Sequence, residues 1–328
     1  MSHDEQQHVK PMSDRPDPAL SVIVYARDDA GTITECLASL SDQDFPHQFE
    51  VLVVDDCSSD GTAEIVRTEF PQFVLVRQER VRGWVASVRR ALTMARGEVL
   101  AFLGSHCTAD RGWLSAVDTR MSGKRQVMTG RGTHGEDGFL ARFEAVSVHA
   151  SYVGSREGEV SFLWDDNFAI RSAVLERALP RSDRCLSDGA GAVLLSLELQ
   201  RMGIPIHYEP SAQIDHVTHP LGAIIAYWYG EMAENAVAIK LEEPSLPWAR
   251  ILWTGPVAAL TLAGARFYQG IRASWLSRDE LPVSLLEVGA HGCLYACLGL
   301  AYFVGLCREI GQNWGQINHG LRARLGFD

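Results

Sequence analysis

Short apolar strands alternate with amphipathic segments through the first hundred residues of this chain. Strands are expected at 20–25, 50–54, 73–77 and 98–103, and helices between them at 33–40, 62–70 and 84–95. Strands that are separated by helices pair in parallel, and the helices cover both faces of the sheet. The alternation therefore predicts an α/β domain with a mostly parallel sheet, flanked by helices. Ligands of such sheets bind beyond the carboxyl ends of the strands, where we look for functional residues.

Charge and cysteine usage narrow the class of protein. The 328 residues carry a formal net charge of -11, and this acidic balance argues against nucleic acid as a partner. The seven cysteines include no CxxC pair, so neither a disulfide framework nor a zinc site is indicated. Residues 1–18 are polar and lack the apolar stretch of a signal peptide, which predicts a disordered tail.

The last third of the chain is much more apolar. Residues 288–307 contain no Asp, Glu, Lys or Arg, and a bilayer is crossed by about 20 apolar residues. A second uncharged stretch, 251–265, is shorter and contains Pro256. These stretches are either a pair of buried core helices or membrane-associated helices. We expect residues 236–328 to be a helical, membrane-associated region on the cytoplasmic side, because arginines follow the second stretch.

Two acids stand directly after the second expected strand. The segment 53–62 places Asp55 and Asp56 at the mouth of the parallel sheet. Carboxylates in that position accept hydrogen bonds from a nucleobase or a ribose hydroxyl. The alternative is that Asp55 caps the next helix.

In this segment and several others, the chain resembles the family 2 glycosyltransferases, which are inverting enzymes with the GT-A fold. The match covers roughly residues 20–220 and rests on 21–30, 36–46, 53–62, 95–103, 167–171 and 208–216. The resemblance implies a GT-A domain over residues 19–235. It also implies transfer of a sugar from a nucleotide-sugar donor to a saccharide or lipid-linked acceptor, with inversion. Trailing apolar helices suit the membrane-associated members of the family.

The same resemblance assigns the nucleotide-binding residues and the cation site. The residues it implies for the nucleotide are Ala26, Arg27, Asp29, Asp55, Asp56, Arg89 and Ser105. Where the family has Asp-x-Asp to hold a divalent cation, this chain has Gly104, Ser105 and His106. A hard cation prefers carboxylate oxygens, so this departure makes a Mg²⁺ or Mn²⁺ cofactor doubtful; His106 is a poorer ligand for Mg²⁺ than for Mn²⁺. The remaining candidate ligands are His106, Asp110 and His216.

The catalytic base and the diphosphate-binding groups also depart from the family. The two positions that align with its Glu-Asp pair are Gly191 and Ala192, and neither accepts a proton. Asp188 is the best remaining base, although it equally suits an N-cap; Asp165 and Asp166 are weaker candidates.

An arginine cluster that includes Arg80, Arg82, Arg89 and Arg90 would bind a diphosphate without a metal, unless it is only a solvated helix face.

Two functions from different classes follow from these departures. The leading hypothesis is an active glycosyltransferase. The alternative is a catalytically inactive glycosyltransferase-like protein that binds a nucleotide or a partner enzyme. A nicotinamide oxidoreductase is disfavoured, because no GxGxxG follows the first expected strand.

Overall fold

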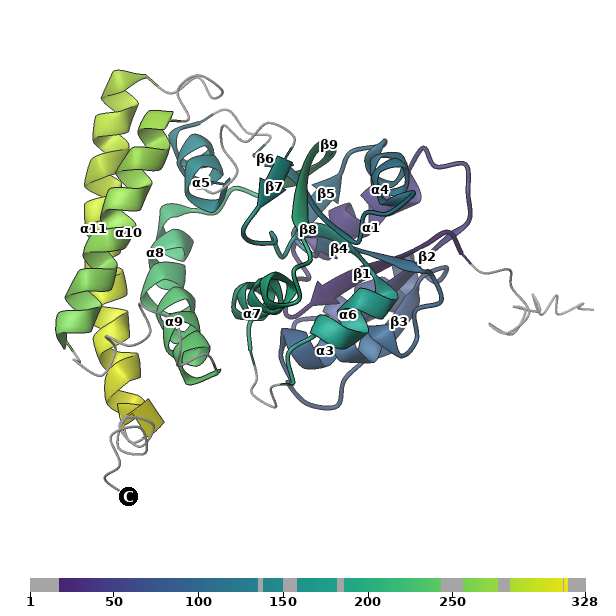
Figure 1. The fold of residues 1–328 in the computed structure, drawn as a ribbon, viewed down its shortest axis with the longest axis horizontal. Helices are drawn as coiled ribbons and strands as arrows, with labels where there is room; N and C mark the ends of the chain where they lie inside the picture. The colour runs from purple at the N-terminus through teal and green to yellow at the C-terminus, as the bar shows by residue number, and fades with distance from the viewer. Residues whose placement is uncertain are drawn as a thin grey trace, which may run out of the picture.

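The computed structural model describes residues 18–134, 138–149, 158–181, 186–242, 256–276, 284–314 and 316–317. An α/β domain built on one large sheet lies beside a bundle of helices that come mostly from the second half of the chain (Figure 1). The expected tail at 1–18 falls almost wholly outside the described residues.

The amino-terminal half of the sheet is parallel, as the alternation predicted. Its strand order is β3-β2-β1-β4, and each neighbouring pair runs in the same direction. The strands are β1 (Leu20–Ala26), β2 (Phe49–Asp55), β3 (Val74–Arg77) and β4 (Val99–Gly104), and the helices between them are α1 (Ile33–Ser41), α2 (Thr62–Glu69) and α3 (Trp84–Leu92). Tyr25 of β1 is in register with Gly104 of β4, so the loops after these two strands start side by side.

The other half of the sheet mixes strand directions. It continues as β8 (Asn167–Arg171), β6 (Val127–Thr133), β9 (Ile206–His216) and β5 (Cys107–Ala109), with β7 (Gly158–Val160) paired to β9. β8 runs antiparallel to β4, with Leu103 opposite Asn167. The residues that precede β8 therefore meet the residues that follow β4. The sheet is therefore mixed: β1–β4 pair in parallel, β6 also pairs in parallel with β9, and the other pairings in this half are antiparallel.

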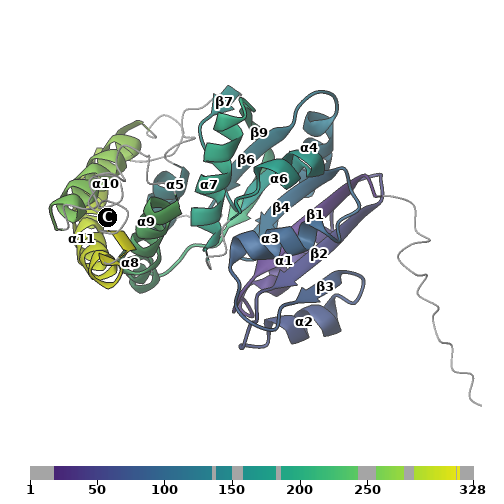
Figure 2. The ribbon, with the colours of Figure 1, turned by 60° about the horizontal axis from the view of Figure 1, so that its bottom comes forward.

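Helices cover both faces of this sheet (Figure 2). On one face, α1 and α4 (Trp113–Met121) pack against side chains such as Val22 and Val24 of β1. On the other face, α3, α6 (Ser172–Ala178) and α7 (Asp188–Arg201) pack against Ile23 and the neighbouring strands. Alternate residues of β1 thus enter different cores, which explains why all its residues except Ser21 are apolar or aromatic.

The remaining helices form a separate bundle. They are α5 (Phe139–His149), α8 (Leu221–Tyr229), α9 (Glu231–Glu242), α10 (Pro256–Leu276) and α11 (Leu285–Gln312), and they enclose a core of their own. The domain boundary expected at residues 235/236 lies inside α9. Pro256 is the first residue of α10, a position where its missing N–H costs no hydrogen bond. The stretch 251–255 lies outside the described residues.

Within the described part of the chain, α11 is the one helix that is long and apolar enough to cross a membrane. Its most apolar window has a mean hydropathy of 1.6 and is 33% buried. Core helices of soluble proteins share this length and composition, so the helix alone does not decide between the two expectations.

Candidate functional site

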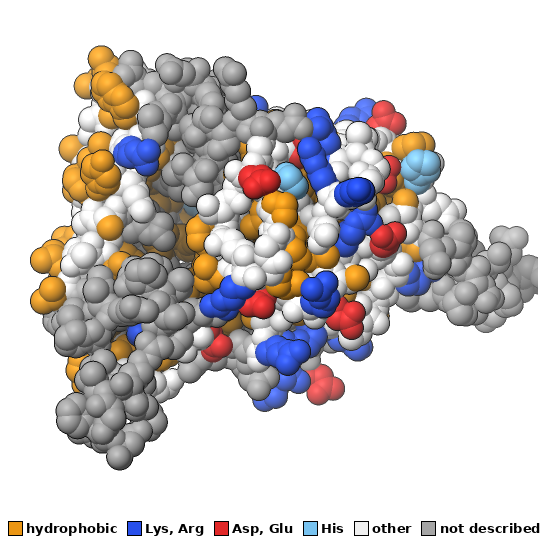
Figure 3. Space-filling view, viewed as in Figure 1, with side chains coloured by type: hydrophobic (Ala, Val, Ile, Leu, Met, Phe, Trp, Pro, Cys, Tyr) orange, Lys and Arg blue, Asp and Glu red, His pale blue; other side chains and the backbone are white. Residues whose placement is uncertain are grey.

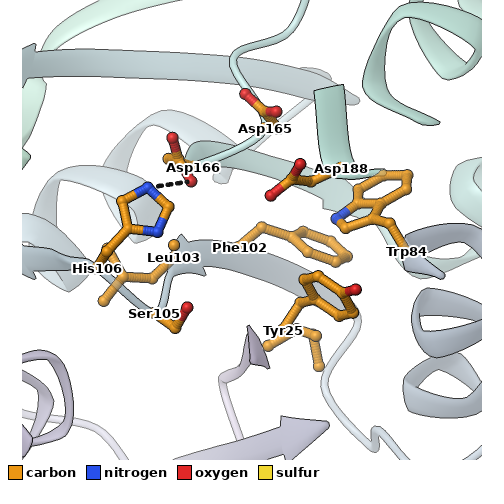
Figure 4. A pocket seen from close by; sticks show the side chains of 11 residues that line it. Tyr25, Trp84, Phe102, Leu103, Ser105, His106, Asp165, Asp166 and Asp188 are labelled. Carbon is orange, nitrogen blue, oxygen red and sulfur yellow. Dashed lines mark ion pairs between the residues drawn. The ribbon is translucent and has the colours of Figure 1, made fainter. Parts of the chain in front are cut away.

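A pocket opens at the carboxyl ends of β1 and β4 (Figure 4). The walls come from both strands, from the first residue of α3, from the start of α7 and from the two residues that precede the entry to β8. They are Ile23, Tyr25, Trp84, Phe102, Leu103, Gly104, Ser105, His106, Asp165, Asp166 and Asp188. Three carboxylates and one imidazole therefore meet over an apolar floor.

Asp166 occupies the space that a side chain at position 104 would need. A Cβ added to Gly104 would lie 2.8 Å from Cγ of Asp166, closer than real Cβ contacts. The backbone supports the approach, because Gly104 donates its N–H to the carbonyl of Asp166 at 3.0 Å. The carboxylate missing from β4 is thus replaced in space by one from the β8 side of the sheet.

Asp166 lies between two histidines. One carboxylate oxygen is 3.4 Å from Nε2 of His106, and the other is 3.8 Å from Nε2 of His216. Ligand atoms of His106, Cys107, Asp166 and His216 all lie within 4.8 Å of one another. Nδ1 of His216 is 2.7 Å from the carbonyl oxygen of Val217, so Nδ1 carries the proton and Nε2 presents its lone pair to the cluster.

The two histidines differ in charge. Burial lowers the pKa of His106, but the charge and hydrogen bond of Asp166, together with the charges of Asp188 and Asp29, outweigh burial and raise this pKa to about 10. Burial lowers the pKa of His216 to about 3, and the positive charge on His106 adds to the effect. Burial also raises the pKa of the Cys107 thiol well above its usual range. His106 is therefore a cation, while His216 and Cys107 are neutral.

Asp188 belongs to the pocket and not to the helix cap. The N-cap of α7 is Ser187, whose hydroxyl accepts a hydrogen bond from the N–H of Ala190. Asp188 follows as the first helical residue and points into the pocket beside Trp84 (Figure 4). Burial raises its pKa, and the neighbouring Asp166 carboxylate raises it further. The carboxyl group of Asp165 is shifted in the same direction for the same reasons.

The Trp84 ring fills the space that a side chain at position 191 would need, and the family resemblance would place an acid at that position. A Cβ added to Gly191 would lie 3.0 Å from Cζ3 of the Trp84 ring. A helix repeats every 3.6 residues, so Asp188 and Ala192 share one face of α7. Asp188 therefore projects from the same side, one turn earlier.

The loops after β1 and β2 hold each other in place. Asp29 accepts hydrogen bonds from the backbone N–H of Arg27 and from the Ser105 hydroxyl, at 2.8 and 2.7 Å. Asp28 has a φ of 58° and bonds to Ser58 and Ser59 of the second loop. Asp and Asn tolerate that left-handed conformation, which explains an Asp where the family usually has Asn. The structure thus brings together Ala26, Arg27, Asp29 and Ser105.

Asp55 and Asp56 are fully buried. Asp55 accepts from the N–H of Ser58 and lies 3.2 Å from Nε of Arg77. Asp56 accepts from the N–H groups of Arg82 and Gly83, both at 2.8 Å. Asp55 does not cap α2, whose N-cap is Gly61. Contact of either acid with a nucleotide stays a prediction.

Two expected site residues lie elsewhere. Asp110 follows the far end of β5, where its N–H bonds to the carbonyl of Gln213, and it is not part of the His106 cluster. Arg89 is exposed on α3 and donates to the carbonyl of Pro180 at 2.7 Å, away from the pocket lining. The arginine cluster therefore contributes no side chain to the pocket wall.

Sequence reasoning missed the placement of Asp166, Trp84 and Tyr25. The sequence offers Asp166 only as a weak candidate for the base. The Asp165-Asp166 pair just before an extended segment was the available signal, but it points to the end of β4 only once the pairing of β8 with β4 is known.

Comparison with known proteins identifies the class of this domain. Residues 21–179 match the family described as glycosyl transferase family 2. Glycosyltransferase AglE of Haloferax volcanii is 33% identical over 110 residues, which cover 32% of this chain and 36% of AglE. Poly(ribitol-phosphate) β-N-acetylglucosaminyltransferase TarS of Staphylococcus aureus is 45% identical over 89 residues, which cover 26% of this chain and 16% of TarS. The matched segments thus span about a third or less of these relatives.

Among solved structures, the mannosyltransferase PcManGT of Pyrobaculum calidifontis, in complex with GDP-Man and Mn²⁺, superimposes with a TM-score of 0.58. The superposition covers 92% of this chain and 91% of PcManGT, at 21% sequence identity. At that identity the likeness establishes a shared fold.

Proposed function

Residues 21–179 form a family 2 glycosyltransferase domain, and from this premise we propose that the protein transfers a sugar from a nucleotide-sugar donor to a saccharide or lipid-linked acceptor, with inversion. The observation that carries the proposal is the convergence of Asp165, Asp166, Asp188 and His106 on one pocket at the end of β1 and β4. This convergence favours an active enzyme over a non-catalytic nucleotide-binding protein, because a carboxylate remains near the expected base position.

Asp188 is the base in this proposal. The acceptor oxygen attacks the anomeric carbon, the bond from that carbon to the diphosphate oxygen breaks, and the acceptor proton passes to the Asp188 carboxylate. A raised pKa makes Asp188 a better proton acceptor than an ordinary aspartate. Inversion follows from a single displacement, since the acceptor enters on the face opposite the leaving diphosphate.

His106 and the loop after β1 would hold the donor. The pKa of His106, about 10, keeps a positive charge at the end of β4, close to where a diphosphate would bind. The loop after β1 starts beside this end of β4, and its Asp29 accepts a hydrogen bond from the Ser105 hydroxyl. A divalent cation, when bound, would replace the proton on His106 and supply the charge neutralisation in its place, and the residues that fit it are His106, Asp166 and His216.

The test is turnover with a panel of uridine and guanosine nucleotide-sugars, including the GDP-mannose that PcManGT binds. Release of nucleoside diphosphate should depend on an added acceptor and fall by about 10²- to 10⁴-fold in Asp188→Asn, the contribution typical of a general base. The matched control is Glu198→Gln, a partly exposed acid on the same helix that pairs with Arg201. Nucleotide binding without turnover in the wild type would favour the inactive alternative.

We also propose that the helical bundle docks on a membrane, with the pocket on the cytoplasmic side. Large apolar side chains are exposed along its outer surface, where they gather at the edge of the molecule (Figure 3). On α10 they are Val257, Leu260, Phe267, Tyr268 and Trp275, and on α11 they are Leu285, Leu286, Leu300 and Val304. A bilayer would bury these apolar side chains without breaking hydrogen bonds, so a membrane is the partner that suits this face.

Vesicle flotation of the full chain tests this docking. Leu260→Glu with Leu300→Glu places two charges at positions that are 67% and 64% exposed, so folding should be unaffected. The double variant should lose flotation with phospholipid vesicles. Val81→Glu, at an exposed apolar position on the α/β domain, should float as the wild type does. Equal flotation of all three proteins, or flotation of none, would contradict membrane docking through this face.

A further inference from the structure

We propose that Asn235 of α9 is a positioning residue for sugar transfer, which fixes the first turn of α7 and with it the carboxylate of Asp188. A helix of the bundle then takes part in a site that otherwise belongs to the α/β domain. The inference rests on the proposed function for the role of Asp188 as the base. The contact between Asn235 and α7 does not depend on that role and can be measured by itself.

Helix α9 packs against both parts of the molecule. It lies beside α7 of the α/β domain in both ribbon views (Figure 1, Figure 2). Ile239 of α9 is buried together with Leu195 of α7 in the core on one face of the sheet. Ala233 and Val237 of α9 are buried in the core of the bundle. Because α9 is held on both sides, a side chain that it directs at α7 has a fixed place.

Asn235 contacts α7 at the first turn of that helix. Its side-chain carbonyl oxygen, Oδ1, accepts a hydrogen bond from the Ser187 hydroxyl at 2.7 Å. A Cβ added to Gly189 would lie 3.5 Å from Nδ2 of Asn235, which is an ordinary contact distance. The amide group of Asn235 therefore lies beside both the N-cap residue and the second residue of α7.

The Ser187 hydroxyl links Asn235 to the cap of α7. A hydroxyl has one hydrogen to donate and lone pairs with which to accept. Ser187 directs its hydrogen at Asn235, while its oxygen accepts from the N–H of Ala190 at 3.2 Å. Asn235 thus determines the rotation of the hydroxyl and keeps a lone pair aimed at the first turn. Without the Asn235 acceptor the hydroxyl is free to rotate, and the turn loses part of its cap.

Asp188 is the next residue and takes its position from this turn. Oδ1 of its carboxylate accepts from the N–H of Gly189 at 2.9 Å. A general base acts only within hydrogen-bond reach of the proton that it takes, and a displacement of about 1 Å can cost about 100-fold in rate. A small movement of the turn is therefore enough to slow transfer. The donor-binding residues after β1 and β4 belong to other elements and stay in place.

The experiment compares kcat and KM for release of nucleoside diphosphate, with the panel of uridine and guanosine nucleotide-sugars named above. Asn235→Leu is close in size but lacks the acceptor oxygen. It should lower kcat by about 10- to 100-fold and change KM for the nucleotide-sugar by less than about 2-fold. Ser187→Ala removes the other end of the same hydrogen bond and should act alike. The double variant should lose no more than the worse single variant, because both changes remove one interaction.

Two further variants separate positioning from a general loss of structure. Ser187→Thr keeps a hydroxyl at the N-cap and should retain kcat within about 3-fold of the wild type. Glu234→Leu is the matched control, since Glu234 is the exposed neighbour of Asn235 on α9, and it should leave kcat and KM unchanged. Thermal melts show that each variant is folded. A kcat of Asn235→Leu equal to that of the wild type, or an equal loss of kcat in Ser187→Thr and Ser187→Ala, overturns the inference.

Hydrogen exchange provides a readout that needs no turnover. Peptides that cover residues 186–192 should exchange faster in Asn235→Leu than in the wild type, and in Glu234→Leu they should exchange at the wild-type rate. Equal exchange in all three proteins overturns the inference. Faster exchange in Asn235→Leu, in a protein whose wild type transfers no sugar, would support the contact and contradict the proposed function alone.

Discussion

Replacement of Asp56 by alanine is expected to release the loop between β3 and α3. The carboxylate accepts hydrogen bonds from the N–H groups of Arg82 and Gly83 at 2.8 Å and from Nε2 of Gln78 at 2.9 Å. The Tyr25 hydroxyl adds a longer bond at 3.3 Å. Gly83 is the residue before Trp84, which starts α3 and lines the pocket. Asp56 thus holds the backbone segment that positions Trp84 in the pocket wall.

The magnitude follows from the donors that lose their acceptor. In Asp56→Ala two backbone N–H groups are left without a partner, and the one on Gly83 is buried. A buried unsatisfied group costs about 1–3 kcal/mol, and the partly buried N–H of Arg82 lies at the low end of that range. The free energy of unfolding should fall by about 2–4 kcal/mol. Asp56→Asn keeps one acceptor oxygen and should lose about half as much.

Urea unfolding and hydrogen exchange measure the global and the local effect. The control is Asp42→Ala, which removes an exposed carboxylate and should change stability by less than about 0.5 kcal/mol. In Asp56→Ala, peptides that cover residues 78–86 should exchange faster, while peptides of α1 keep their protection. If Asp56→Ala matches Asp42→Ala in both measurements, the hydrogen bonds of Asp56 do not hold this loop.

Three further changes test other parts of the structure. Asp55→Ala should weaken binding of uridine or guanosine nucleotides by about 1–3 kcal/mol in calorimetry, the range for a lost charged hydrogen bond, and unchanged affinity in a folded variant would rule out contact with the nucleotide. Gly191→Ala should lower the melting temperature through overpacking worth about 1–3 kcal/mol, because its Cβ would collide with Cε3 of the Trp84 ring, whereas Gly222→Ala in α8 has open space and should melt at or slightly above the wild-type temperature. The N–H of Ser284, Arg142 and the Ser284 hydroxyl lower the pKa of Glu287 to about 2, so its stabilising effect is complete above pH 4.5 and is lost as the pH falls toward 2. Wild type and Glu287→Gln should accordingly differ in melting temperature at pH 7 and converge near pH 2; a constant difference would show that this carboxylate does not titrate as described.

The amino-acid sequence by itself determined the parallel half of the sheet and the kind of site to expect. Buried strands such as β1 are recognised in the sequence by runs of mostly apolar residues. The residues at the end of each such strand directly follow it in the sequence, so they can be identified without knowledge of the fold. The loss of acids at Gly104 and Gly191 was equally visible. Fold class and the resemblance to family 2 glycosyltransferases needed no long-range information, and the match over residues 21–179 confirmed the resemblance.

Only the tertiary structure decided which side chains lie near positions 104 and 191, where the expected acids are missing. Asp166 reaches Gly104 because β8 pairs with β4, and His216 reaches His106 because β9 pairs with β5. Asp188 lines the pocket while Ser187 caps α7, and Arg89 donates to the carbonyl of Pro180. Hydrophobic periodicity specifies which face of an element is buried. It does not specify strand register between distant segments, and that register brought the carboxylate and the two imidazoles together.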